Sequence, residues 1–283
     1  MRLAYALGGG GARGIAHIGV IKALEEAGIH PHLIVGCSMG AVVGAMYAQT
    51  NSAAAVENRL HNYMASDHYL EMERKHFSRD VKEAGFWGAA VKRVDDRIKI
   101  DLSATQKALL PLNAFSQALN LLLNDDLMEN LPIDYAAVAC DLITGKKVVL
   151  TQGTLITAVL ASGSIPGILP PVPYQNWILT DGEASDIVPV ATAKELGAGF
   201  TIAFDVSQNF ITHPSLENTL EIVNRVAQIK SYELKKLKMA AADFIITPDV
   251  GRFHWSEFRA YEDILQAGYL AGKQALSGLN NII

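Results

Sequence analysis

The sequence is poor in cysteine, in net positive charge and in long apolar runs, and each shortage excludes a class of protein. Only two of its 283 residues are cysteines, Cys37 and Cys140, so disulfide bonds cannot stabilise the fold, which fits a reducing cytosol. A formal net charge of -5 argues against a nucleic acid partner, because such binding needs Lys and Arg to neutralise phosphates. No apolar run reaches the roughly 18 residues that span a bilayer, and Leu3 to Leu7 is too short for a signal peptide. We therefore expect a cytoplasmic, globular protein.

What the sequence does contain is an alternation of short apolar runs with stretches of helical period, which is typical of an α/β sheet. No linker or internal repeat divides the chain, so residues 1–283 are predicted to form a single domain. Strands are expected at residues 2–7, 32–35, 135–141, 147–151, 177–180, 200–206 and 244–247. Helices are expected from Ile15 to Gly28 and at residues 41–49, 154–161, 190–196, 216–239 and 257–273.

One region, at about residues 52–130, departs from this alternation, since it is charged, mostly of helical period and shows little strand signal. We interpret it as a helical excursion from the sheet that covers a site, as lids and substrate-contacting insertions often do. The alternative is a set of helices that only pack on one face of the sheet.

The five residues Gly36-Cys37-Ser38-Met39-Gly40 fit the pattern G-x-S-x-G between a predicted strand and a predicted helix, which is the context of a nucleophile elbow. A serine on such a sharp turn needs neighbours without side chains, and Gly36 and Gly40 supply that room. The helix that follows Ser38 favours negative charge at its N-terminus. Ser38 is therefore the candidate nucleophile.

A second glycine-rich segment, residues 8–14, lies between the first strand and the first helix. Such a loop directs several backbone N–H groups at one point and can bind an anion, including the oxyanion of an acyl-transfer intermediate. Arg13 would add a fixed positive charge or hold the loop in place.

The same segment also fits the dinucleotide-binding pattern G-x-G-x-x-G through Gly9, Gly11 and Gly14. That interpretation requires an acidic residue about 20 positions further on, at the end of the second strand. The second strand instead runs directly into the serine turn, and Glu25 and Glu26 come too early. The sequence therefore gives little support to a dinucleotide site.

The candidate nucleophile needs a base, and two kinds of residue could provide it. A chain order of serine, acid and histidine leaves His213 and His254 as candidates, although either can be a surface or packing histidine. Asp181-Gly182, the only Asp-Gly pair, follows the strand at 177–180, at the edge where open α/β sheets place their sites. An ordinary turn aspartate is the alternative. No spacing typical of a metal site is present.

Taken together, the glycine loop, the G-x-S-x-G turn and the late Asp-Gly pair resemble the patatin-like phospholipase family. Residues 161–172 look like the proline-rich segment that precedes the aspartate in that family, and Val188-Pro189-Val190 matches the Pro-Val that follows it. The resemblance runs from Met1 to about Val250 and is greatest to compact bacterial members related to neuropathy target esterase.

The resemblance implies a three-layer αβα sandwich with a mostly parallel central sheet, related to cytosolic phospholipase A2. It implies a Ser-Asp dyad in which Ser38 is the nucleophile and Asp181 the base, with Gly182 supporting the turn, and acyl-ester hydrolysis through an acyl-serine without metal or cofactor. The residues that would form the oxyanion hole and bind substrate are Gly9, Gly10, Gly11, Ala12, Arg13 and Met39.

The expected substrate is a lipid or another ester, and a non-catalytic lipid- or nucleotide-binding regulator on the same fold is the alternative. Phe86, Trp87, Phe115 and residues 121–123 are predicted to line an acyl groove or to pack in the core. Lys230, Lys235, Lys236 and Lys238 form the solvated face of a long helix or a transient contact with an anionic membrane.

Two positions depart from the family pattern. Glu183 stands where Gly or Ala is usual, and Asp186 stands where Asn is frequent. Three carboxylates within six residues predict that the pKa of Asp181 rises by like-charge repulsion, or that the other two compete for its place.

Overall fold

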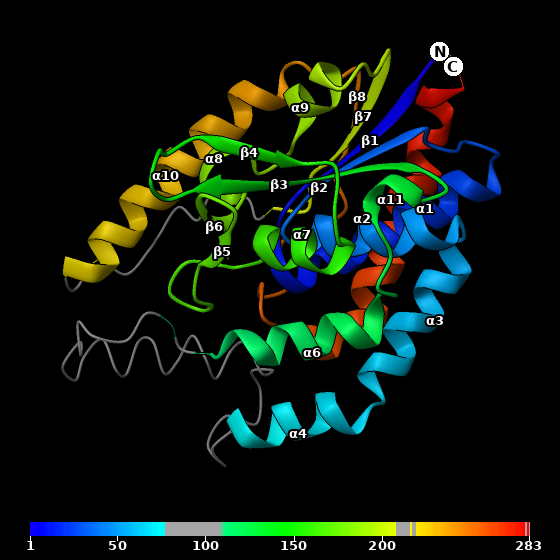
Figure 1. The fold of residues 1–283 in the computed structure, drawn as a ribbon. Coiled ribbons are helices and arrows are strands. Elements are labelled where there is room, and N and C mark those ends of the chain that lie inside the picture. Colours follow the sequence, from blue (N-terminus) through cyan, green and yellow to red (C-terminus); the bar gives the residue numbers. More distant parts are fainter. Residues whose placement is uncertain (77–107, 109, 208–215, 217–218, 281, 283) are drawn as a thin grey trace.

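The centre of the protein is an eight-stranded mixed sheet with helices on both faces, a three-layer αβα sandwich (Figure 1). The computed structural model describes residues 1–76, 108, 110–207, 216, 219–280 and 282. The strand order is β5-β6-β3-β2-β1-β7-β8, and β4 pairs with β3. The strands are β1 (Leu3–Leu7), β2 (Leu33–Cys37), β3 (Asp134–Asp141), β4 (Lys147–Leu150), β5 (Val172–Tyr174), β6 (Trp177–Asp181), β7 (Phe200–Phe204) and β8 (Phe244–Ile246).

The helices divide between the two faces of the sheet. On one side lie α1 (Ala16–Glu26), α2 (Met39–Thr50), α3 (Ala53–Met64), α4 (Asp67–His76), α6 (Leu112–Leu122), α7 (Leu155–Ser162) and α11 (Tyr261–Leu279). On the other side lie α8 (Glu183–Asp186), α9 (Val190–Glu195) and α10 (Thr219–Met239). Short 3-10 helices occupy Gly11–Ile15, Met128–Asn130 and Phe258–Ala260.

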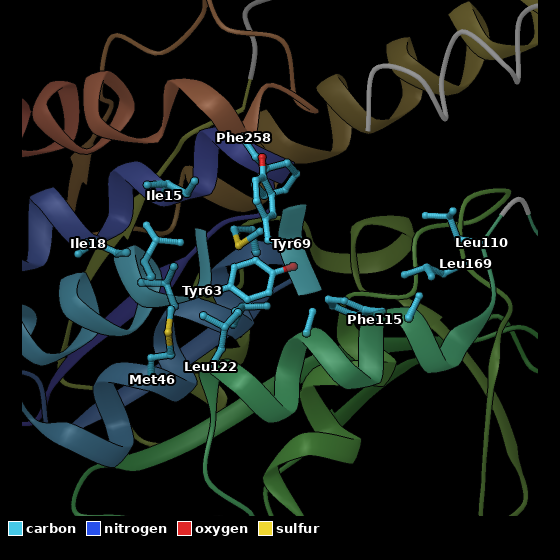
Figure 2. A pocket seen from close by; sticks show the side chains of 16 residues that line it. Ile15, Ile18, Met46, Tyr63, Tyr69, Leu110, Phe115, Leu122, Leu169 and Phe258 are labelled. Atoms are coloured by element: carbon cyan, nitrogen blue, oxygen red, sulfur yellow. The ribbon is translucent and has the colours of Figure 1, made fainter. Parts of the chain in front are cut away.

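The predicted helical excursion is confirmed in the described part of residues 52–130, where α3, α4 and α6 lie outside the sheet. These helices do more than pack on the sheet, because together with α1 and α2 they enclose an apolar pocket (Figure 2). Its lining includes Leu60, Tyr63, Tyr69, Phe115, Ala118 and Leu122 from the excursion. The excursion therefore builds a cavity as well as a layer.

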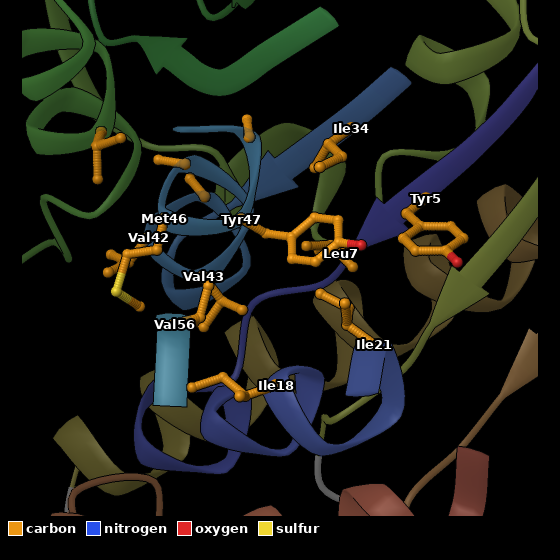
Figure 3. Packing of buried hydrophobic residues seen from close by; sticks show 14 of the residues in the cluster. Tyr5, Leu7, Ile18, Ile21, Ile34, Val42, Val43, Met46, Tyr47 and Val56 are labelled. Atoms are coloured by element: carbon orange, nitrogen blue, oxygen red, sulfur yellow. The ribbon is translucent and has the colours of Figure 1, made fainter. Parts of the chain in front are cut away.

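Alternation along β1 explains why the two sides of the sheet differ. Tyr5 and Leu7 point to one face, where they pack in the large core with side chains of α1, α2 and α3 such as Ile18 and Tyr47 (Figure 3). Ala4 and Ala6 point to the opposite face and pack in smaller clusters with α9. Since successive strand side chains alternate between faces, one short segment sets both layers.

The predicted strands and helices are confirmed within a few residues wherever the structure describes them, and the structure adds two short elements. The sequence reading did not include β5, whose three residues contain Pro173, or the four-residue helix α8. The sheet is parallel through β3, β2, β1, β7 and β8, while β4, β5 and β6 pair antiparallel. Among the described helices, none is both long enough and apolar enough to cross a bilayer.

Candidate active site

Ser38 occupies the turn between β2 and α2 in a backbone conformation that residues other than glycine rarely adopt. Its φ is 54° and its ψ is -126°, so the turn stores local strain, as nucleophile turns do. A Cβ atom at Gly36 would lie 2.5 Å from Ala41 Cα, and one at Gly40 would lie 2.2 Å from Leu7 O. The glycines therefore allow the sharp turn that presents Ser38, which is 6% exposed.

Asp181 reaches the same place because two strands meet end to end along one side of β3. Cys37, the last residue of β2, pairs with Val138, while Asp181, the last residue of β6, pairs with Ala139. Both Val138 and Ala139 pair with β4 on the other side, so β2 and β6 share the remaining side. The parallel strand β2 and the antiparallel strand β6 therefore bring their carboxyl ends together, although Ser38 and Asp181 are 143 positions apart in the sequence.

The close approach of these strand ends is visible in their contacts. The Cys37 thiol lies 3.7 Å from Asp181 Oδ1. A Cβ atom at Gly182 would lie 2.3 Å from Val138 O and 3.1 Å from Cys37 Sγ. A residue larger than glycine at position 182 would push the acid away from the serine turn. Cys37 is itself buried, and burial raises the pKa of its thiol, so a packing role fits it and a thiolate nucleophile does not.

Two serines at the C-terminal end of α7, Ser162 and Ser164, connect to both strand ends. The Ser38 amide donates to Ser162 Oγ at 3.1 Å, and the Ser162 hydroxyl donates to Val138 O at 2.6 Å. The Asp181 amide donates to Ser164 O at 3.0 Å. Sequence reasoning found this segment only through the family resemblance and assigned it no role. A buried serine at the end of an apolar helix is the signal that points to Ser162.

The Asp181 carboxyl is 1% exposed, and its two oxygens have different surroundings. Oδ1 accepts the Glu183 amide at 2.8 Å. Oδ2 is buried and has no hydrogen bond of normal geometry among the described residues. Burial first, and then the Glu183 carboxylate, raise the pKa of Asp181 to about 7, while the Glu183 amide and the Ser38 and Cys37 side chains oppose the rise. The predicted repulsion from Glu183 is confirmed, but burial has the larger effect.

The glycine loop lies directly against the serine turn. A Cβ atom at Gly9 would be 3.2 Å from Ser38 Cβ, and Gly11 has a φ of +57° with its backbone against Trp255. Arg13 is 7% exposed, its Nε–H donates to Gly10 O at 3.3 Å, and its Nη1 is buried without a partner among the described residues. Its guanidinium thus holds the loop in place.

The loop amides differ in whether they are free. Two of them already donate to carbonyl oxygens elsewhere in the chain, namely Gly9 to Ile187 at 2.9 Å and Ala12 to Trp255 at 2.6 Å. In the part of the chain that the structure describes, the amides of Gly10 and Gly11 have no such acceptor. Met39 begins α2, and the first amides of a helix have no acceptor within the helix.

Comparison with known proteins identifies the family. Residues 5–194 match the family described as Patatin-like phospholipase. The chain belongs to the patatin-like phospholipase family. It is 28% identical to mouse patatin-like phospholipase domain-containing protein 6 and to lysophospholipase nte1 of Emericella nidulans, over 98% and 97% of this chain but 20% and 18% of theirs. It is also 34% identical to an uncharacterized NTE family protein of Mycobacterium bovis, over 73% of this chain and 49% of that one.

This chain thus spans about a fifth of the length of its mouse and fungal relatives. Among solved structures, VipD from Legionella pneumophila aligns with 98% of this chain and 66% of its own, with a TM-score of 0.48 and 14% sequence identity.

In this patatin-like protein, two pockets of different composition border Ser38. A polar pocket of about 290 Å³ also contains Arg13, Glu183, Arg225 and Lys235, and its volume is near the lower end for ligand sites, roughly 300 Å³. On the other side, a small apolar cleft runs past Ser38 and shares Met39, Val42, Phe115 and Phe258 with the pocket beneath the excursion. The serine therefore lies where polar and apolar cavities meet.

Of the residues predicted to line an acyl groove, Phe115 and Leu122 line the apolar pocket (Figure 2). Leu123 is buried in the core, and Leu121 is 51% exposed. The use of this pocket for an acyl chain stays a prediction. Phe86 and Trp87 lie outside the described residues.

Of the two histidines of the alternative mechanism, the one that the structure describes, His254, does not line a pocket at the serine. Its Nδ1 lies 2.5 Å from Ser256 Oγ. His213 lies outside the described residues. The fully buried His17 donates from Nε2 to Gly8 O at 2.8 Å, and burial lowers its pKa to about 4, so it stays neutral and holds the glycine loop. The described chain contains no group of three side chains suited to a metal ion.

Asp186 and Lys235, two further charged residues of the region, are engaged in ion pairs. Asp186 is buried, accepts the Thr192 hydroxyl at 2.8 Å, and lies 3.6 Å from Lys147 Nζ and 3.5 Å from Lys238 Nζ. It is therefore held away from competition with Asp181. The interpretation of the lysine run as one solvated face is wrong for Lys235, which is buried, because its Nζ pairs with Asp205 at 2.8 Å.

Proposed function

We propose that this protein hydrolyses acyl esters of lipids, with Ser38 as the nucleophile and Asp181 as the base. The observation that carries the proposal is the meeting of β2 and β6 on β3, which puts a strained serine next to a buried carboxyl group. The names of the mouse and fungal relatives, a phospholipase domain protein and a lysophospholipase, support a lipid ester as substrate.

The proposed reaction has two steps that share the same acid. In the first, Asp181 Oδ2 takes the proton of Ser38 Oγ while Oγ attacks the ester carbonyl carbon. The protonated carboxyl then gives this proton to the leaving alcohol oxygen as the carbon–oxygen bond breaks, leaving an acyl-serine. In the second step, Asp181 removes a proton from water, the water oxygen attacks the acyl carbon, and Ser38 recovers its proton as the fatty acid leaves.

The negative charge of each tetrahedral intermediate falls on the former carbonyl oxygen. We assign its stabilisation to the amides of Gly10 and Gly11, because those of Gly9 and Ala12 are already used within the protein. The amide of Met39, at the N-terminus of α2, is the third donor of the proposal. The assignment is narrower than the one that the sequence resemblance implied.

The pKa of Asp181 suits a group that accepts and returns a proton near neutral pH. A carboxyl with a pKa of about 7 is a stronger base than an ordinary aspartate, whose pKa is near 4. Burial of the site provides the change without a histidine. This dual use of one carboxyl is the reason that the proposal needs no imidazole.

The two pockets at Ser38 support a substrate that is polar at one end and apolar at the other. In the proposal, the acyl chain extends from Ser38 into the apolar pocket beneath α6, while the alcohol portion faces Arg13 and Arg225 in the polar pocket. A phosphate-bearing alcohol would complement these guanidinium groups. A lysophospholipid or phospholipid fits this description.

The proposal is tested with Ser38→Ala and Asp181→Asn, assayed on a lysophospholipid and on a small activated ester. Each substitution is expected to lower kcat by at least about a thousandfold, because the nucleophile or its base is lost, while circular dichroism shows a folded protein. His254→Ala is the matched control and is expected to keep its activity. A fluorophosphonate should label the wild type at Ser38 but label neither Ser38→Ala nor Asp181→Asn.

Two results would replace the proposal with its alternatives. An Asp181→Asn variant that stays active, beside an inactive His254→Ala or His213→Ala variant, would indicate a Ser-His-acid esterase. A folded wild type with no labelling and no turnover would indicate a non-catalytic lipid- or nucleotide-binding regulator.

A further inference from the structure

Helix α10 turns a row of polar side chains toward the protein and several large apolar side chains toward solvent, unlike an ordinary surface helix. Its inward side chains line the polar pocket of Ser38, namely Arg225, Gln228, Ser231, Tyr232 and Lys235. Its outward face carries five large apolar side chains with high exposure: Ile222 at 48%, Val223 at 57%, Val226 at 44%, Ile229 at 41% and Leu237 at 76%.

The five apolar residues, called the α10 stripe below, lie on one side of the helix. Ile222, Val223, Val226 and Ile229 lie within two turns on one side of the helix, and Leu237 follows on the same side eight residues later, so the group extends over about 22 Å at 1.5 Å per residue. Single exposed apolar side chains are ordinary, but several of them gathered on one helix face indicate an interaction site.

The stripe cannot be buried by a roll of the helix, because α10 is fixed from its inner side. Lys235 is buried and its Nζ donates to Asp205 Oδ2 at 2.8 Å and to Ser207 Oγ at 2.5 Å. One turn later, Lys238 donates to the carbonyl of Ser185 and lies 3.5 Å from Asp186. Rotation of α10 would break this ion pair and leave a buried charge without its partner.

The charge of the helix indicates the chemistry of the missing partner. Three of the five basic residues of α10 face the protein, since Arg225 and Lys235 line the pocket and Lys238 lies beside Asp186, so Lys230 and Lys236 are the basic residues that face outward. Lys230 and Lys236 are exposed on the side of the stripe, where Lys236 pairs with Glu233 at 2.8 Å. A second copy would bring the same basic residues against the stripe, whereas an anionic lipid surface complements both the apolar side chains and the lysines.

We propose that α10 rests on an anionic lipid bilayer, with its stripe in the boundary between headgroups and acyl chains. This contact would hold the polar pocket, which the inner face of the same helix lines, at the surface that supplies the substrate. The binding itself stands apart from the proposed function, and only its effect on hydrolysis rests on it.

The test uses flotation of the full chain with vesicles of phosphatidylcholine alone and of phosphatidylcholine with phosphatidylglycerol. The wild type is expected to bind the anionic vesicles more tightly than the neutral ones. A triple variant, Val223→Ser, Val226→Ser and Leu237→Ser, removes apolar area only from the outward face and is expected to bind at least about tenfold more weakly. Leu270→Ser on α11, at a position 52% exposed, is the matched control and is expected to bind like the wild type.

A second measurement separates the failure of this proposal from failure of the proposed function. The triple variant should hydrolyse a soluble short-chain ester like the wild type but lose hydrolysis of vesicle lipid. If the protein has no esterase activity at all, flotation still decides the membrane contact. Equal vesicle binding by the triple variant and the wild type would overturn the proposal. So would a wild type that ignores vesicles but sediments as a dimer which the triple substitution dissociates.

Discussion

At Asp181, burial and a neighbouring carboxylate act in the same direction on one proton. Burial is the larger cause of the rise in its pKa to about 7, and the Glu183 carboxylate adds to it. Glu183 itself borders the polar pocket. Desolvation there raises the pKa of its carboxyl, and the Arg13 guanidinium opposes the rise. In the proposed mechanism, Glu183, which departs from the family pattern, therefore helps to set the pH at which Asp181 is ionised.

Glu183→Gln is therefore expected to shift the pH dependence of activity. Removal of the negative charge lowers the pKa of Asp181, so more of the base is ionised at pH 6 and the acid limb of kcat/KM moves to lower pH. The shift should be less than about one unit, because solvent in the pocket screens Glu183. Glu195→Gln, at an exposed position on α9, is the control and should leave the profile unchanged. An unmoved acid limb in Glu183→Gln would show that burial alone sets this pKa.

The sequence was sufficient for the candidate site residues but not for the way they meet. Ser38 could be predicted because a strand, a turn with two glycines and a helix follow each other within one short segment. The approach of Asp181 depends on the antiparallel return of β6 along β3. The strand that precedes β6, β5, has three residues including Pro173, which is too short for its sequence to predict a strand. The acceptors of the Gly9 and Ala12 amides, at Ile187 and Trp255, are also far away in the sequence. No local sequence pattern predicts such partners.

At the scale of elements, α6 and α10 have different relations to the site. The apolar side of α6 faces inward and lines the apolar pocket through Phe115 and Ala118. In α10 the polar side faces inward, so periodicity alone would have predicted the wrong orientation. Periodicity shows which residues share a face, but the buried pair of Lys235 with Asp205 decides which face turns inward.

Ala118→Phe is expected to shorten the acyl chain that the protein accepts. The larger side chain fills the apolar pocket, and each methylene that loses its place costs about 0.8 kcal/mol. For a dodecanoyl ester, exclusion of four methylenes would lower kcat/KM by roughly a hundredfold, while a butanoyl ester should be affected less than about threefold.

Leu121→Phe, at the exposed side of the same helix, is the matched control for this experiment and should leave the chain-length profile unchanged. An equal loss for short and long esters in Ala118→Phe would argue that α6 is needed for folding of the site and does not select the acyl chain.

At the scale of the whole molecule, the buried Asp181 lowers the free energy of unfolding near and above neutral pH. The folded protein holds Asp181 protonated up to about pH 7, whereas an aspartate in the unfolded chain ionises near pH 4. This raised pKa therefore favours the folded state most below pH 4, and the contribution is lost as the pH rises to 7. The linkage amounts to about 4 kcal/mol between these limits.

Asp181→Asn is accordingly expected to change stability in a way that depends on pH. The neutral amide avoids the cost of a buried charge, so at pH 8 the variant should unfold at a higher urea concentration than the wild type. At pH 4.5 the two midpoints should approach each other. Asp125→Asn, at an exposed loop position, serves as the control with no such dependence. A variant that is less stable than the wild type at pH 8 would contradict the assigned environment of Asp181.

The end-to-end meeting of β2 and β6 has a consequence for the stage of folding at which Ser38 becomes reactive. A chain that has formed only its first βαβ unit contains the serine turn but not its partner, because Asp181 takes its place only when β6 pairs with β3. Labelling of Ser38 by a fluorophosphonate should therefore lag behind the appearance of secondary structure during refolding. It would report the pairing of β6 with β3.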